Sequence, residues 1–193
     1  TNDLTSLAFK ERSDIFGAYS RDNEYLPGSI LAGETQFTLA AEPTNATDDV
    51  TVEILNNDID ATISKVEGSS FTYKLVTAKT GTITIKAVSA SLGEENAVTK
   101  EVKVYANTDE GIASFLSETT WERPNPTSGL ASLDFVATTS TTGTVAYSST
   151  QLGGGFEASG TYSVQNGQIV LETTAWNPNT ESAKKFKLQY VNV

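Results

Sequence analysis

Oxygen-bearing side chains gather in two stretches of the sequence and are its first candidates for metal chemistry. Asp48 and Asp49 form one group, and residues 56–60, Asn-Asn-Asp-Ile-Asp, form the other. Calcium takes about six to eight oxygen ligands from loops of this kind. The spacing does not match an EF-hand loop, and no Glu follows at the required offset. Asn and Asp also favour turns, because their side chains bond their own backbone. We therefore predict turns here and no metal site.

Catalytic chemistry has few candidates in this chain. The sequence contains no Cys, His or Met, which removes thiolate nucleophiles, the commonest general base and the usual ligands of zinc, copper and iron–sulfur clusters. Hydrolysis by paired carboxylates needs two acids at a defined separation, and Glu157, Glu172 and Glu181 are candidates only by being acidic. Residues 153–155, Gly-Gly-Gly, lack the Lys and Ser/Thr of a phosphate-binding loop. We predict that the protein is not an enzyme and holds no cofactor.

Binding chemistry has stronger candidates, because aromatic side chains concentrate in the second half of the chain. They are Trp121, Phe135, Tyr147, Phe156, Tyr162 and Trp176. Side chains of this type line apolar ligand cavities or fill a core, and both interpretations stay open. Trp176 differs because Asn and Pro surround it in a predicted loop, where an indole can stack on a sugar or a partner, or cap the end of the domain. We predict Trp176, Tyr147 and Trp121 as ligand-binding residues, with Trp176 as the main anchor.

Charge and composition limit the class of partner. The 193 residues carry 24 acidic and 13 basic side chains, a formal net charge of −11, and the pI is about 4.4. A nucleic-acid partner is not expected, because phosphate backbones repel an acidic surface and a basic face is the usual mark of such binding. Nothing in the sequence resembles a signal peptide or an apolar span of membrane length.

The elements that must position these side chains are short β-strands. Apolar residues alternate with polar ones from Gly33 to Tyr105, and turn-forming residues interrupt the pattern every 8–12 residues or so, which is typical of a β-sandwich. Residues 1–29 lack a clear pattern, and we interpret them as an N-terminal arm that packs on the following domain.

A second β-region follows after a change of pattern at Ala106. Residues 107–110, Asn-Thr-Asp-Glu, have capping-box spacing and predict one short helix near 108–116. About six strands follow, and residues 165–168, Gln-Asn-Gly-Gln, carry the Asn-Gly signal of a type I′ hairpin turn. We predict a domain boundary near residue 106.

Three motifs give residues 30–105 a resemblance to the bacterial immunoglobulin-like group 2 domain. They are Gly33-Glu34-Thr35, the Pro-Thr-Asn-Ala-Thr of residues 43–47, and the Gly-Thr-Ile-Thr-Ile of residues 81–85. The family usually has a Trp after the Ala-Thr, where this chain has Val-Thr-Val-Glu at 50–53. We therefore expect Phe37, Phe71, Tyr73 and the aliphatic side chains to fill the core instead.

Residues 107–193 resemble a lipocalin-like β-domain of small bacterial lipoproteins. Four motifs carry the resemblance: Thr119-Thr120-Trp121, Leu133-Asp134-Phe135, Gly143-Thr144-Val145 and Gly160-Thr161-Tyr162-Ser163-Val164. A closed lipocalin barrel takes about eight strands, so six predict a part-open barrel or a small sandwich. The expected fold class is all-β, an immunoglobulin-like β-sandwich followed by a lipocalin-like part-barrel or sandwich.

Together the two resemblances imply an exported, non-enzymatic protein of a bacterial surface or envelope. We expect a spacer or adhesion module followed by a small binding domain, a protein or glycan partner, and attachment to the membrane only through a lipid anchor upstream of residue 1. The alternative hypothesis is a lipocalin-like carrier of a small apolar ligand. An enclosed cavity within 107–193 favours the carrier, whereas a filled core favours adhesion.

Overall fold

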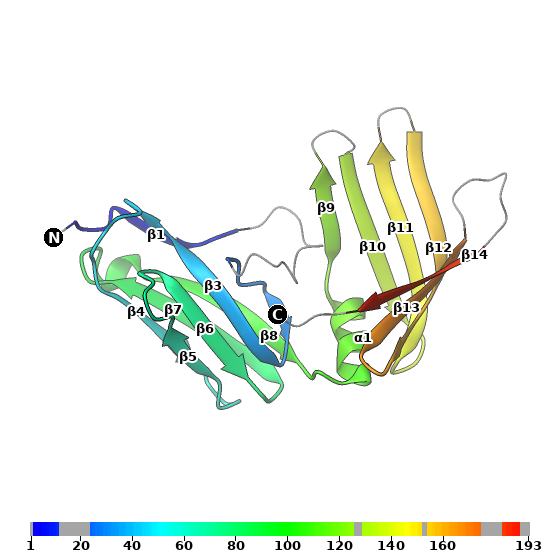
Figure 1. Ribbon diagram of the computed structural model, residues 1–193, viewed down its shortest axis with the longest axis horizontal. Coiled ribbons are helices and arrows are strands. Elements are labelled where there is room, and N and C mark those ends of the chain that lie inside the picture. The colour runs from blue at the N-terminus through cyan, green and yellow to red at the C-terminus, as the bar shows by residue number, and fades with distance from the viewer. Residues whose placement is uncertain (1, 12–23, 126–128, 152–153, 175–182, 190–193) are drawn as a thin grey trace. The chain divides into compact units, whose positions relative to one another are not determined.

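The computed structural model describes residues 2–11, 24–125, 129–151, 154–174 and 183–189. The regular elements among these residues are β-strands, one α-helix and one 3₁₀ turn. The chain contacts divide the described residues into two compact units, one ending at Tyr105 and the other beginning at Ala106. The all-β class expected from the alternation of apolar and polar residues is confirmed (Figure 1).

The first unit consists of two four-stranded sheets. One sheet has the order β1-β3-β6-β5 and the other has the order β2-β8-β7-β4. Their bounds are β1 Ser6–Phe9, β2 Ser29–Leu31, β3 Gly33–Glu42, β4 Val50–Leu55, β5 Thr62–Lys65, β6 Thr72–Thr77, β7 Gly81–Ser89 and β8 Val98–Tyr105, with a 3₁₀ turn, η2, at Glu94–Asn96. This strand order is that of an immunoglobulin-like sandwich. β2 pairs with β8 in parallel, and the other neighbours within the two sheets are antiparallel.

The core of this unit lies between the two sheets, where alternate residues of each strand face inward. Its fully buried members include Phe37, Leu39, Leu75, Ile83, Ile85 and Val102. Phe37 stacks on Tyr73 with 6.0 Å between ring centroids, and Phe71 is also buried. The aromatic residues expected to replace the family's Trp are therefore core residues.

Part of the expected N-terminal arm belongs to the sandwich itself. β1 pairs with β3 in the register Ser6↔Glu42, and Leu4, Leu7 and Phe9 join the core. β1 has only four residues, a window too short for period-2 alternation to stand out in the sequence.

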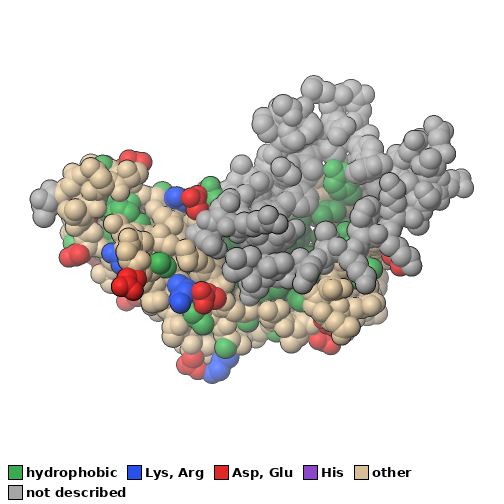
Figure 2. Space-filling model, in the orientation of Figure 1, with side chains coloured by type: hydrophobic (Ala, Val, Ile, Leu, Met, Phe, Trp, Pro, Cys, Tyr) green, Lys and Arg blue, Asp and Glu red, His purple; other side chains and the backbone are tan. Residues whose placement is uncertain are grey.

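Charges of both signs are interspersed on the visible face of the first unit (Figure 2). The ion pairs of this unit include Lys100–Glu11, at 3.4 Å, and Lys74–Glu34, at 3.9 Å. Exposed pairs of this kind contribute little to stability.

The second unit is one α-helix packed on an open antiparallel sheet. The helix is α1, Asp109–Glu118, and the strands are β9 Trp121–Asn125, β10 Gly129–Ala137, β11 Thr142–Gln151, β12 Gly154–Gln165, β13 Gln168–Thr174 and β14 Ala183–Gln189. The strands follow one another in chain order from β9 to β14. β9 and β14 are the edges and do not pair with each other in the described residues, so these strands form an open sheet rather than a closed barrel.

α1 covers one face of this sheet through contacts with β10 and β12. Its N-cap is Thr108, whose Oγ1 accepts a hydrogen bond from the Gly111 amide at 3.1 Å, one residue later than the Asn107 cap that the capping-box spacing predicts. Four helix side chains are buried against the sheet: Ile112, Ala113, Phe115 and Leu116. No helix among the described residues has the length and apolarity needed to span a membrane.

Candidate functional site

A chain of aromatic rings fills the space between α1 and the sheet of the second unit. Phe115, Trp121, Phe135 and Tyr162 meet edge to face, with successive centroid distances of 5.2, 6.4 and 5.2 Å. All four side chains are buried. Edge-to-face pairs add stability beyond the area they bury, so these rings form a core rather than the lining of a ligand cavity.

Trp121 is the central member of that chain. It is 3% exposed, and its indole Nε1 donates a hydrogen bond to the main-chain oxygen of Leu116 at 2.9 Å. Both the ring and the polar edge therefore have partners within the unit. The structure places this predicted ligand-binding residue in the core, which is the other interpretation that the sequence left open.

Tyr147 lies in the same cross-strand row as Trp121. Leu133 on β10 pairs with Trp121 on one side and with Tyr147 on the other. Tyr147 is half-buried. Trp176, the predicted anchor, lies outside the described residues.

The oxygen-rich loops of the first unit bond to the protein. Asp48 Oδ2 accepts hydrogen bonds from the hydroxyls of Ser89 and Ser91. The side chain of Asn57 closes a turn, accepting from the Ala61 amide at 2.8 Å and donating to the Ala61 carbonyl at 2.7 Å. These are the turn interactions expected of Asn and Asp. Within the described part of the chain, no three acidic side chains group closely enough to hold a metal ion.

The hydrogen bonds at Asp48 also change its acidity. The Ser89 hydroxyl, followed by that of Ser91, holds the pKa of Asp48 below its ordinary value, because hydrogen bonds to a carboxylate favour the charged form. Ser89 is 1% exposed, so this contact fastens the loop carrying Asp48 to the end of β7.

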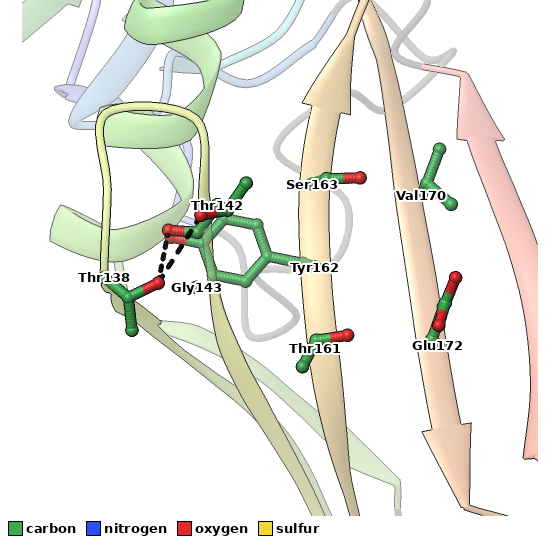
Figure 3. A pocket seen from close by; sticks show the side chains of 8 residues that line it. All are labelled: Thr138, Thr142, Gly143, Thr161, Tyr162, Ser163, Val170 and Glu172. Atoms are coloured by element: carbon green, nitrogen blue, oxygen red, sulfur yellow. Dashed lines mark hydrogen bonds between the residues drawn. The ribbon is translucent and has the colours of Figure 1, made fainter.

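A groove of about 260 Å³ lies across β11, β12 and β13 in the second unit. It is lined by Thr138, Thr142, Gly143, Thr161, Tyr162, Ser163, Val170 and Glu172. Figure 3 shows Thr161 and Ser163 on β12 directed toward Glu172 and Val170 on β13. The register explains this arrangement, because Thr161 is paired with Glu172 and Ser163 with Val170.

The groove's polar residues lie on the face of the sheet opposite the helix. Thr161 and Glu172 are exposed. Tyr162, the residue after Thr161 on β12, is 2% exposed and packs in the aromatic core. Successive residues of a strand point to opposite faces, so alternate residues of β12 divide between groove and core.

Gly143 lines the groove and also lies against the buried ring of Tyr162. A Cβ at this position would come within 2.5 Å of Tyr162 Cε1 and 2.1 Å of the Val136 carbonyl oxygen. Only glycine lets the Tyr162 ring lie against β11 here (Figure 3). Burial raises the pKa of the Tyr162 hydroxyl, and its oxygen has no partner that meets hydrogen-bonding geometry.

The groove suits hydrogen bonding better than catalysis. Thr138 bonds to Thr142 of the same turn. The Thr161 hydroxyl points toward Glu172, the one carboxylate among the described lining residues, and the Ser163 hydroxyl points toward Val170. Glycoside hydrolysis by an acid pair needs two carboxyl groups flanking one bond, and the lining provides one. Hydroxyls with one acceptor carboxylate can bind a polar, hydroxyl-bearing ligand.

Sequence inspection identified two of these lining residues, Glu172 as one of three acids and Tyr162 as one of six aromatic residues. The available signal was the alternation of hydroxyl residues along two segments, Thr142 and Thr144 in one and Thr161 and Ser163 in the other. That alternation indicates a polar strand face. It does not indicate which strands are neighbours, and the groove depends on that pairing.

Comparisons with known proteins leave the family open. No family model matches the chain, and no curated protein matches it. One solved structure, "Structure of the S-layer protein SbsC, domains 5-6", is 13% identical over 98% of this chain and 99% of that chain, with a TM-score of 0.34. A similarity of this size assigns neither a fold nor a function.

Proposed function

We propose that this protein is an exported, non-enzymatic component of a bacterial cell surface or envelope. In this proposal the first unit is a spacer or adhesion module of the bacterial immunoglobulin-like group 2 type. The second unit carries the binding surface. The supporting observation is the strand order β1-β3-β6-β5 over β2-β8-β7-β4, formed by the segment whose motifs resemble that family.

The proposed binding surface is the groove on β11, β12 and β13. Except for Thr138, its hydroxyl and carboxylate groups stand on regular strands, which hold them in fixed positions. Such groups complement the hydroxyls of a glycan, because each hydroxyl both donates and accepts. A surface glycan is therefore the partner class we favour over a protein.

Support for a carrier of a small apolar ligand is weaker. Such a carrier needs an enclosed apolar cavity, whereas edge-to-face aromatic contacts fill the helix-covered side of the sheet. The described groove is lined mainly by polar residues. The lipocalin-like resemblance of residues 107–193 thus contributes a strand pattern to the proposal and not a carrier function.

The groove is tested with matched substitutions on paired strands. Thr161 lines the groove, and its cross-strand neighbour Thr144 is exposed outside the lining. Thr161→Val and Glu172→Gln should each weaken binding of the full chain to purified bacterial cell-wall polysaccharide by roughly three- to tenfold, about one hydrogen bond. Thr144→Val should bind as the parent does. Equal binding by all variants would remove the groove from the proposal.

Trp176 and Tyr147 remain predicted ligand-binding residues and need their own test. Trp176→Ala should reduce polysaccharide binding while leaving the melting temperature unchanged, because an indole in a binding loop contributes contact area rather than folding energy. A fall of several degrees with unchanged binding would instead identify Trp176 as structural. Tyr147→Ala, measured in the same way, tests Tyr147 as a ligand-binding residue separate from the groove, on the face of the sheet that it shares with Trp121.

The proposed location is tested on whole cells. We expect the protein to be exposed on the surface and held by a lipid upstream of residue 1. Protease added to intact cells should remove it, and its release should require detergent. Full protection from protease in intact cells, with degradation only after lysis, would contradict surface exposure.

A further inference from the structure

The hairpin turn between β12 and β13 contains the one Asn-Gly pair of the sequence, Asn166-Gly167. Asn166 has φ 52° and Gly167 has φ 74°, the left-handed backbone that a type I′ turn requires at both positions. Gln165 and Gln168 pair on either side of it. Asn166 is exposed, so its side-chain amide is open to solvent.

Asp109 holds both amides of this turn. Its Oδ2 accepts a hydrogen bond from the Asn166 amide at 2.9 Å, and its Oδ1 accepts one from the Gly167 amide at 2.8 Å. Asp109 is the first residue of α1. One carboxylate therefore fastens the β12–β13 hairpin to the start of the helix, across 57 and 58 residues of sequence.

We propose that Asn166 is a site of spontaneous deamidation and that Asp109 restrains the reaction. The Gly167 nitrogen gives up its proton and attacks the side-chain carbon Cγ of Asn166. The new C–N bond closes a succinimide ring, and the side-chain nitrogen leaves as ammonia. Water then opens the ring at either carbonyl, giving aspartate or isoaspartate. The sequence consumes water, releases ammonia and changes no oxidation state.

The restraint acts on the attacking atom. The Gly167 N–H that must be lost is the group donated to the Asp109 carboxylate, and a neighbouring negative charge opposes the build-up of negative charge on that nitrogen. The turn must also leave its left-handed conformation before the nitrogen can reach Cγ. Glycine is what makes the site reactive at all, because the residue that supplies the nitrogen has no side chain to hinder the attack.

Conversion would loosen the same contact that restrains it. Either product adds a negative charge at residue 166, in the turn whose amides bind the Asp109 carboxylate, and like charges repel. Isoaspartate also adds one methylene to the backbone of a two-residue turn, which has no room for it. We therefore expect the converted hairpin to separate from the start of α1, lowering the stability of the second unit.

The chain contains an internal control. Asn56 is also exposed and has a left-handed backbone, with φ 53°. The next residue, Asn57, carries a side chain that is bonded to Ala61. Asn56 should therefore stay unconverted under conditions in which Asn166 reacts.

The experiment follows deamidation of the folded full-length chain at mildly alkaline pH and 37 °C by peptide mass analysis and isoaspartate-specific methylation. Asp109→Ala removes the carboxylate that holds the turn, and Glu110→Ala removes an exposed carboxylate from the same helical turn. Circular dichroism confirms that each variant is folded during the incubation. Gly167→Ala tests the need for glycine; its Cβ would meet no neighbouring atom, although the left-handed backbone at φ 74° strains any side chain there.

We expect slow conversion at Asn166 in the parent protein and in Glu110→Ala. Conversion should be roughly tenfold faster in Asp109→Ala, because that variant loses about one net hydrogen bond. Gly167→Ala should suppress the reaction, and converted parent protein should melt at a lower temperature. The proposal is overturned if Asp109→Ala converts at the parent rate, if Glu110→Ala accelerates conversion equally, or if Asn166 is stable in every variant.

Discussion

Trp121 Nε1 donates a hydrogen bond to the Leu116 carbonyl oxygen at 2.9 Å, joining the start of β9 to the last turn of α1. The same indole meets Phe115 and Phe135 edge to face. A residue that the sequence suggested as ligand-binding, on the basis of its aromatic side chain, thus connects the helix to the sheet. Its ring and its polar edge both act within the core of the second unit.

Trp121→Phe should therefore destabilise the second unit. The substitution keeps an aromatic ring but removes the Nε1 donor and some volume, so we expect a loss of about 1–3 kcal/mol in the free energy of unfolding. Urea unfolding followed by circular dichroism measures it. Trp176→Phe is the matched control, and a loss of equal size there would mean that the effect is not specific to Trp121.

Acid should weaken the first unit through Asp48. Its pKa is lowered by the hydroxyls of Ser89 and Ser91, so the folded value lies below the unfolded one. The stabilisation is then present above the unfolded value, near pH 4, and disappears as pH falls through the lower folded value. Asp48→Asn should flatten the fall in melting temperature between about pH 5 and pH 2. Asp49→Asn, an exposed neighbour, should leave the parent profile unchanged.

Gly143→Ala should be poorly tolerated for a steric reason. The added methyl would lie 2.1 Å from the Val136 carbonyl oxygen and 2.5 Å from Tyr162 Cε1, so the backbone or the buried ring must shift. Overpacking of this kind costs about 1–3 kcal/mol. Gly28→Ala is the control, because its nearest neighbour is the Glu101 oxygen at 4.0 Å. Similar melting temperatures for both variants would show that the hairpin yields easily.

Limited proteolysis near residue 106 should release two folded pieces. The contacts among the described residues form two groups, and the chain passes from one to the other between Tyr105 and Ala106. β8 ends at Tyr105, before α1 begins at Asp109. Mass analysis should locate the first cut between these elements, and each fragment should unfold cooperatively on heating. Loss of structure in both halves after a single cut there would show that the units depend on each other.

The local features of this protein were predictable from its sequence. Alternation of apolar and polar residues indicates a strand wherever one face is buried, and the six strands expected after residue 106 are all present. The Asn166-Gly167 turn was also predicted, because only residues that accept positive φ fit its two central positions. The short helix was expected at 108–116 and spans Asp109–Glu118.

Register and distant contacts were decided by the tertiary structure alone. Alternation shows that Tyr162 and Thr161 face opposite sides of a strand, but not that α1 covers the Tyr162 side while Thr161 is paired with Glu172. The hydrogen bond from the Gly167 amide to the Asp109 carboxylate joins residues that are 58 positions apart in the sequence. Side-chain type and spacing along the chain encode local conformation. Which segments meet when the whole core is packed decides the groove, the burial of Trp121 and the hydrogen bonds of Asp109 to the hairpin turn.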